Sequence, residues 1–103
     1  MKFKEAFIIL APEVDPAKDC AIIDTPKYTC YTVLVQDVPQ ALAEAKKLVE
    51  HEGVKAISLC PGFSNQAVSQ VTEAVGNTVA VCVARGDVPS IKVIGDCIAQ
   101  AQW

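Results

Sequence analysis

The sequence lacks the runs and spacings that identify several classes of protein. Nine Lys and Arg residues are scattered along the chain and outnumbered by twelve Asp and Glu, for a net charge of −3, so there is no basic stripe for nucleic acid. The longest apolar runs, residues 6–12 and 78–84, are far shorter than the roughly 20 residues of a membrane-spanning helix. No small-x-small cleavage site follows the first run, so we expect no secretory signal.

Cysteine is frequent, but its spacing matches no metal or disulfide pattern. The five cysteines include no C-x-x-C pair, and an odd number does not suit a disulfide framework. Cys60, Cys82 and Cys97 lie inside apolar runs, where a thiol packs as a small hydrophobic group. There is also no Walker lysine and no G-x-G-x-x-G turn. We therefore expect a reducing, cytoplasmic setting, with neither a metal nor another cofactor.

The composition is that of one globular domain over residues 1–103. Hydrophobic residues make up 51% of the chain and charged residues 20%, which excludes a disordered chain. A domain of this size buries only about two thirds of the surface that its unfolded chain exposes. The apolar excess therefore predicts that a partner subunit covers part of the surface, and a homodimer is the first expectation.

Apolar periodicity predicts an α/β domain with a mostly parallel, four-stranded sheet and flanking helices, in the order β-β-α-β-α-β-α. Asp37 and Ser64 have the spacing of helix caps, and Gly53 and Gly76 are typical helix stops. The continuous apolar run at 78–84 is typical of a central parallel strand. The expected strands cover residues 3–10, 28–35, 54–60 and 78–84, and the expected helices cover 38–52, 64–75 and 88–101.

Two segments are harder to assign. Asp15 and Pro16 predict a short helical turn over residues 16–20, and residues 21–23 suit a brief extended stretch. The segment 88–101 fits one helical face, although an edge strand followed by a short helix would also suit it. The helix is the favoured interpretation.

Ligands of open parallel sheets bind beyond the carboxyl ends of the strands. Cys60 ends a strand there and precedes a Pro-Gly turn and a helix N-terminus, whose free amides can hold an anion and lower the pKa of a thiol. In a purely structural interpretation, Pro-Gly only reverses the chain, Ser64 caps the helix and Cys60 packs. The candidate ligand-binding residues are Pro12, Glu13, Cys60, Gly62, Phe63, Ser64, Asn65, Arg85 and Asp87.

Charged residues follow two other strands. Arg85 can hold a carboxylate or phosphate, or else pair with Glu13 or Asp87 inside the chain. Glu13 is a candidate acid or base, although a lone carboxylate in a loop is more often solvated. His51 follows a helix and so belongs at the opposite edge of the sheet, away from a catalytic arrangement.

Several short motifs together resemble a known family. They are residues 6–12 (AFIILAP), the pair Asp15 and Pro16, and residues 23–26 (IDTP), 59–63 (LCPGF) and 81–85 (VCVAR). Over roughly residues 3–87 the chain resembles a family of small uncharacterised prokaryotic α/β proteins, classed as a domain of unknown function. The resemblance implies a small soluble α/β protein and no established reaction.

Three functions are compatible with these features. The first is a small-molecule binding protein for an anion or carboxylate, acting as a homo-oligomer with its site at the carboxyl ends of the strands. The second is a lyase or isomerase that uses Cys60 or Glu13 as base and Arg85 to hold an anion. The third is a structural interaction module. Neither nucleic acid nor a membrane is an expected partner.

Overall fold

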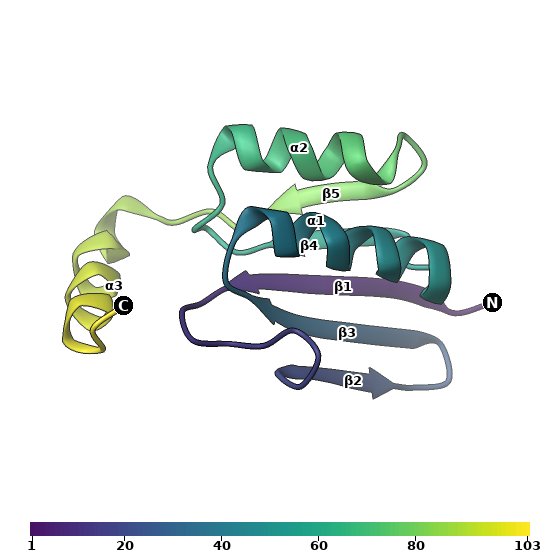
Figure 1. Cartoon of the computed structure of the whole chain (residues 1–103), viewed down its shortest axis with the longest axis horizontal. Helices are drawn as coiled ribbons and strands as arrows, with labels where there is room; N and C mark the ends of the chain where they lie inside the picture. Colours follow the sequence, from purple (N-terminus) through teal and green to yellow (C-terminus); the bar gives the residue numbers. More distant parts are fainter.

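Five strands form one sheet in the order β2-β3-β1-β4-β5, with three helices connected to it (Figure 1). The computed structural model describes all residues, 1–103. β1 pairs in parallel with β3 and β4, β4 pairs in parallel with β5, and β2 runs antiparallel to β3. The prediction of a mostly parallel α/β sheet is therefore confirmed. The elements are β1 (Phe3–Leu10), β2 (Cys20–Asp24), β3 (Tyr28–Val35), α1 (Val38–Lys47), the π-helical turn η1 (Leu48–Glu52), β4 (Ala56–Leu59), α2 (Asn65–Val75), β5 (Ala80–Val83) and α3 (Val88–Gln100).

The strand β2 corrects the predicted four-stranded sheet and its element order. β2 is exposed along its whole length, so it carries no alternation of buried and exposed residues. For that reason the sequence predicts only a brief extended stretch at residues 21–23. A hairpin holds it on β3, with the Thr25 amide donating to the Tyr28 carbonyl at 2.9 Å. Before β2, the predicted helical turn is a single turn closed by the Asp19 amide on the Asp15 carbonyl.

The position of β5 corrects a second expectation. The apolar run at 78–84 forms an edge strand, and β1 is the central strand. The run is continuous because both of its faces are apolar, although only one is covered inside the chain. Val79 is buried and Val81 half-buried, whereas Ala80 and Cys82 are exposed.

The two covering helices begin and end where the sequence predicts. The Asp37 carboxylate accepts from the Gln40 amide at 2.8 Å, and the Ser64 hydroxyl accepts from the Ala67 amide at 3.1 Å. Gly53 ends η1 in the left-handed region at φ 75°, and Gly76 follows α2 at φ 83°. These contacts are all local, which is why short-range spacing predicts them.

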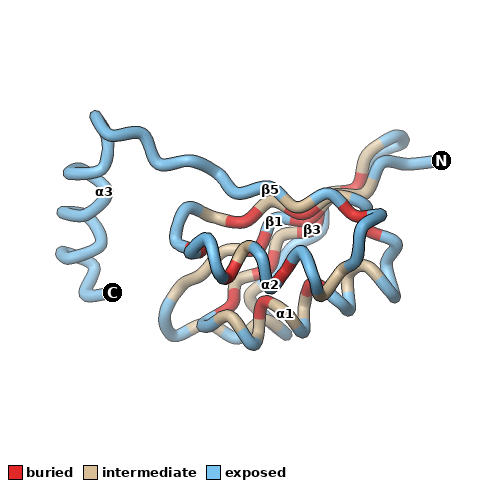
Figure 2. The backbone as a smooth tube through the Cα atoms, turned by 90° about the horizontal axis from the view of Figure 1, so that it is seen from above, coloured by how far each residue is buried: buried red, intermediate tan, exposed pale blue.

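The hydrophobic core lies between the sheet and the helices α1 and α2, which cover the same face of the sheet (Figure 2). Ala41 and Ala45 are fully buried on α1, and their small side chains allow the helix to approach the strands closely. Only 15 of the 103 residues are buried, so much of the apolar content predicted to need cover has none within the chain. The largest fully buried side chains are Ile8, Ile57, Leu59, Val35, Val54 and Val71.

The helix α3 confirms the favoured interpretation of residues 88–101 but stands apart from the rest of the molecule (Figures 1 and 2). Every one of its residues is exposed. The molecule measures 42 × 26 × 25 Å and its radius of gyration is 14.1 Å, against about 13 Å for a compact chain of this length. None of the three helices has the length and apolar character required to span a bilayer.

Candidate functional site

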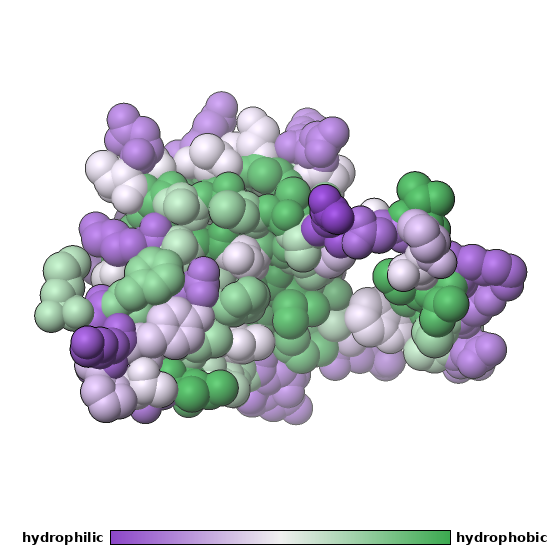
Figure 3. Space-filling view, turned by 180° about the vertical axis from the view of Figure 1, so that it is seen from behind, coloured by the Kyte–Doolittle hydropathy of each residue, from purple (hydrophilic) through white to green (hydrophobic).

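The face of the sheet opposite α1 and α2 is apolar and uncovered, as Figure 3 shows from that side. Phe7 pairs in register with Thr32 and Ser58, and Ser58 with Cys82, so side chains of four strands share this surface. We call it the open face. It consists of Phe3, Glu5, Phe7 and Ile9 of β1, Ala21 and Ile23 of β2, Tyr28, Cys30, Thr32 and Leu34 of β3, Ala56 and Ser58 of β4, and Ala80 and Cys82 of β5.

The open face carries one carboxylate, and a neighbouring side chain satisfies it. The Tyr28 hydroxyl donates to Glu5 Oε1, and this hydrogen bond, with burial and the Glu5 charge, raises the pKa of Tyr28. The remaining side chains of the face are apolar, thiol or hydroxyl groups. The thiols correct the expectation that cysteines in apolar runs are buried, because Cys82 and Cys97 are exposed and Cys60 is only partly covered.

The open face is hollowed at the carboxyl ends of β1, β4 and β5 into a groove of about 330 Å³, which we call the carboxyl-edge groove. Its polar side chains are limited to the Ser58 hydroxyl and the thiols of Cys60 and Cys82. Its walls can therefore exclude water from a small apolar molecule. The lining residues are Phe7, Ile9, Ser58, Leu59, Cys60, Pro61, Cys82, Val83 and Ala84.

Cys60 lies in this groove and is held by the neighbouring strand. Its sulfur accepts from the Leu10 amide at 3.3 Å, and its own amide donates to the Ile8 carbonyl at 3.2 Å. The Phe63 amide closes the turn on the Cys60 carbonyl, and the buried Phe63 ring anchors it in the core. Gly62 is not in the left-handed region, and a Cβ there would lie 3.5 Å from the Cys60 sulfur, an ordinary contact.

The other predicted site residues lie around the groove without lining it. Pro12 and Glu13 form the exposed turn after β1, where Glu13 has φ 57°, and Asn65 is the exposed first residue of α2. Arg85 Nε pairs with Asp87 Oδ1 at 2.9 Å, which is one of the intramolecular pairs that the sequence left open. Cys60 is therefore the predicted residue that the fold places in a hollow.

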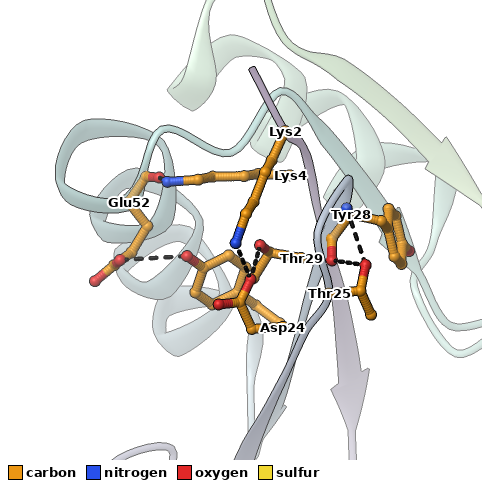
Figure 4. A network of polar contacts seen from close by, with 8 residues as sticks. Lys2, Lys4, Asp24, Thr25, Tyr28, Thr29 and Glu52 are labelled. Atoms are coloured by element: carbon orange, nitrogen blue, oxygen red, sulfur yellow. Dashed lines mark hydrogen bonds and ion pairs between the residues drawn. The ribbon is translucent and has the colours of Figure 1, made fainter.

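Sequence reasoning missed a polar network at the amino ends of the strands (Figure 4). Asp24 Oδ1 accepts from Lys2 Nζ at 2.7 Å and from the Thr29 hydroxyl at 2.7 Å. The hydrogen bond from Lys2, followed by that from Thr29, lowers the pKa of Asp24. Asp24 and Thr29 are close in the sequence, but Lys2 lies 22 residues before Asp24, so only the folded sheet brings the network together.

A second part of the same network joins η1 to the sheet. Lys4 Nζ donates to the Glu52 carbonyl at 2.9 Å, and the Tyr31 hydroxyl donates to Glu52 Oε2 at 3.4 Å. Burial and then the Glu52 charge raise the pKa of Tyr31. These two hydrogen bonds link η1 to the amino edge of the sheet. No buried side-chain polar atom in the molecule lacks a partner. No group of three or more His, Cys, Asp or Glu side chains is placed to hold a metal ion.

The mostly parallel sheet with helices on one face places the protein among small α/β domains. The chain belongs to the Family of unknown function (DUF6506), whose model matches residues 3–95, from β1 into α3. This membership confirms the resemblance carried by the short motifs. Neither a curated protein nor a solved structure matches the chain.

Proposed function

We propose that the protein is a homo-oligomeric binding protein for a small molecule with a carboxylate on an apolar body. The carboxyl-edge groove carries the proposal, because it is a hollow with mainly apolar walls at the place where parallel sheets bind ligands. Its volume of about 330 Å³ falls at the small end of the range for ligand sites, roughly 300 to 1,000 Å³. The uncovered open face around the groove supports the homo-oligomer.

Arg85 is the residue that we assign to the ligand carboxylate. It directly follows the groove residue Ala84, and its pair with Asp87 is highly exposed, at 87% and 59% of the two side chains. Exposed ion pairs contribute only about 0 to 1 kcal/mol, so a ligand carboxylate can replace Asp87 at small cost. Bidentate geometry then favours the guanidinium over a lysine for this role.

Binding fits the site better than the lyase or isomerase alternative. The hydrogen-bond partner of the Cys60 sulfur is a backbone amide, and no acid or base side chain is hydrogen-bonded to it. Glu13 is exposed in the turn after β1, and His51 is exposed in η1. A proton-transfer reaction needs such groups within hydrogen-bond reach of one another.

Calorimetric titration of the wild-type protein with butanoate, benzoate and phosphate tests the proposal. We expect the apolar carboxylates to bind and phosphate to bind more weakly. Cys82→Phe fills the groove and should weaken binding at least tenfold. Ala43→Phe is the control, since it adds the same ring at an exposed position of α1, away from the groove and from the open face.

A second variant measures how much the carboxylate of the ligand contributes to affinity, separately from its apolar body. Arg85→Ala should weaken benzoate by about 1.5 to 3 kcal/mol, the range for a hydrogen bond to a charged group. Its thermal stability should match that of the wild type, because the lost ion pair is exposed. If no carboxylate binds at millimolar concentration, or if both phenylalanine variants bind as the wild type does, the proposal is wrong.

A further inference from the structure

We propose that α3 of a second copy of this chain lies on the open face, and that the two chains of a dimer close each other's carboxyl-edge groove. This inference rests on the homo-oligomer of the proposed function and names the segment that forms it. The inference is argued from two exposed apolar surfaces. One is the open face, which no helix covers, and the other is the apolar side of α3, which packs on no sheet.

The helix α3 has one charged side and one broad uncharged side. Lys92 and Asp96 form an ion pair of 2.6 Å, and at 100° per residue they point away from Ile94 and Ile98. The uncharged arc is exposed all along its length, although apolar helix faces normally pack on a partner. It consists of Val88, Ser90, Ile91, Val93, Ile94, Gly95, Cys97 and Ile98.

The open face matches this arc in charge and in size. The arc has no charged side chain, and the single charged side chain of the open face, Glu5, accepts a hydrogen bond from the Tyr28 hydroxyl. The 13 residues of α3 span about 20 Å, and five strands spaced by about 4.8 Å are about 19 Å wide.

The path of the chain favours a second copy over the chain's own sheet. The Ala84 amide still donates to the Leu59 carbonyl at 2.8 Å, so only residues 85–87 separate the sheet from the helix. Figures 1 and 2 show this connection continuing beyond the carboxyl edge of the sheet, so that α3 stands clear of its own open face. In a two-fold symmetric dimer, the α3 helix of each chain lies on the open face of the other chain, and the two contacts have the same geometry.

The exchange would also complete the ligand site. On the covered face of the sheet, two helices lie over the strands and still leave β2 exposed (Figure 1). One α3 helix, about 10 Å across, covers about half of the open face. The partner's α3 therefore leaves room for a small ligand beside it and forms the missing wall of the carboxyl-edge groove.

Natural cysteines on both surfaces supply a direct test. In Cys20→Ser protein, oxidation with copper-phenanthroline should join the Cys97 thiol to a cysteine of the open face or of the carboxyl-edge groove of the other chain. Two thiols lose their hydrogens to the oxidant as the disulfide forms. The product should be a covalent dimer on a non-reducing gel, with Cys97 linked to Cys30, Cys60 or Cys82 by peptide mapping. Additional Cys97→Ser should abolish it, and so should a variant with serine at positions 30, 60 and 82.

Light scattering on two surface variants provides the second measurement. We expect wild-type protein at twice the chain mass of 11.0 kDa, Ile94→Asp at the mass of one chain, and Gln100→Asp, on the charged side of α3, still dimeric. A wild-type monomer overturns the inference, as does a dimer that Ile94→Asp leaves intact or a disulfide that closes within one chain. A dimer that binds no carboxylate contradicts the proposed ligand instead, and a monomer that binds benzoate contradicts the homo-oligomer and the exchange but not the ligand.

Discussion

At the residue scale, Asp24 shows how one exposed side chain links three strands. It ends β2 and accepts from Lys2, just before β1, and from Thr29 in β3. These hydrogen bonds favour the charged carboxylate, so they lower its pKa below the ordinary 3.8. A carboxyl group with a lowered pKa in the folded state stabilises the fold above its unfolded pKa, and that contribution is lost as the pH falls through the folded-state pKa.

We therefore expect Asp24→Asn to lower the melting temperature at pH 7 and to have a smaller effect as the pH falls below 3.8. Thermal unfolding followed by circular dichroism between pH 2 and 7 measures the difference. Asp96→Asn, which breaks an exposed pair on α3, serves as the control and should change little at any pH. A constant difference between Asp24→Asn and the wild type across the range would show that the Asp24 charge is not involved.

At the scale of elements, two glycines that look alike in the sequence have different roles. Gly53 ends η1 with φ 75°, a conformation that an L-residue adopts only with strain. Gly62 lies in the turn between β4 and α2 with an ordinary backbone and space for a Cβ. Helix termination therefore needs the glycine at position 53, whereas the turn at position 62 does not need one for its backbone.

Gly53→Ala should reduce the free energy of unfolding by about 1 kcal/mol, because alanine must adopt a left-handed conformation. Gly62→Ala is the matched control and should change it by less than about 0.5 kcal/mol, since the loss of unfolded-state entropy offsets any small adjustment. Urea unfolding of the two variants measures both values. If both variants lost the same free energy of unfolding, the strain could not be assigned to position 53 rather than to position 62.

At the scale of the whole molecule, the folded chain covers one face of its sheet and leaves the other apolar and bare. Association that buries the open face stabilises the folded state by mass action. The melting temperature of the wild-type protein should therefore rise with protein concentration, whereas that of Ile94→Asp should stay constant. Scanning calorimetry over a hundredfold range of concentration measures this, and equal behaviour of the two proteins would argue against association through α3.

The sequence by itself determined the local features of this protein. The order of strands and helices along the chain predicted a mostly parallel sheet. The caps at Asp37 and Ser64, the stop at Gly53 and the favoured helix over residues 88–101 followed from groups within a few residues of one another. Such interactions depend on local backbone geometry and on the spacing of residues, and both can be read from the sequence. The turn at Cys60 could also be located, because a strand, a Pro-Gly pair and a cap follow in order.

Only the tertiary structure decided which apolar surfaces are covered. An apolar run shows that a residue prefers to leave water, but not whether the cover comes from its own chain, and so β5 was expected at the centre and lies at an edge. The groove beside Cys60 likewise depends on contacts between distant segments, since residues of β1, β4 and β5 all line it. Such contacts form only when whole strands and helices pack together, because the segments that make them are far apart in the sequence.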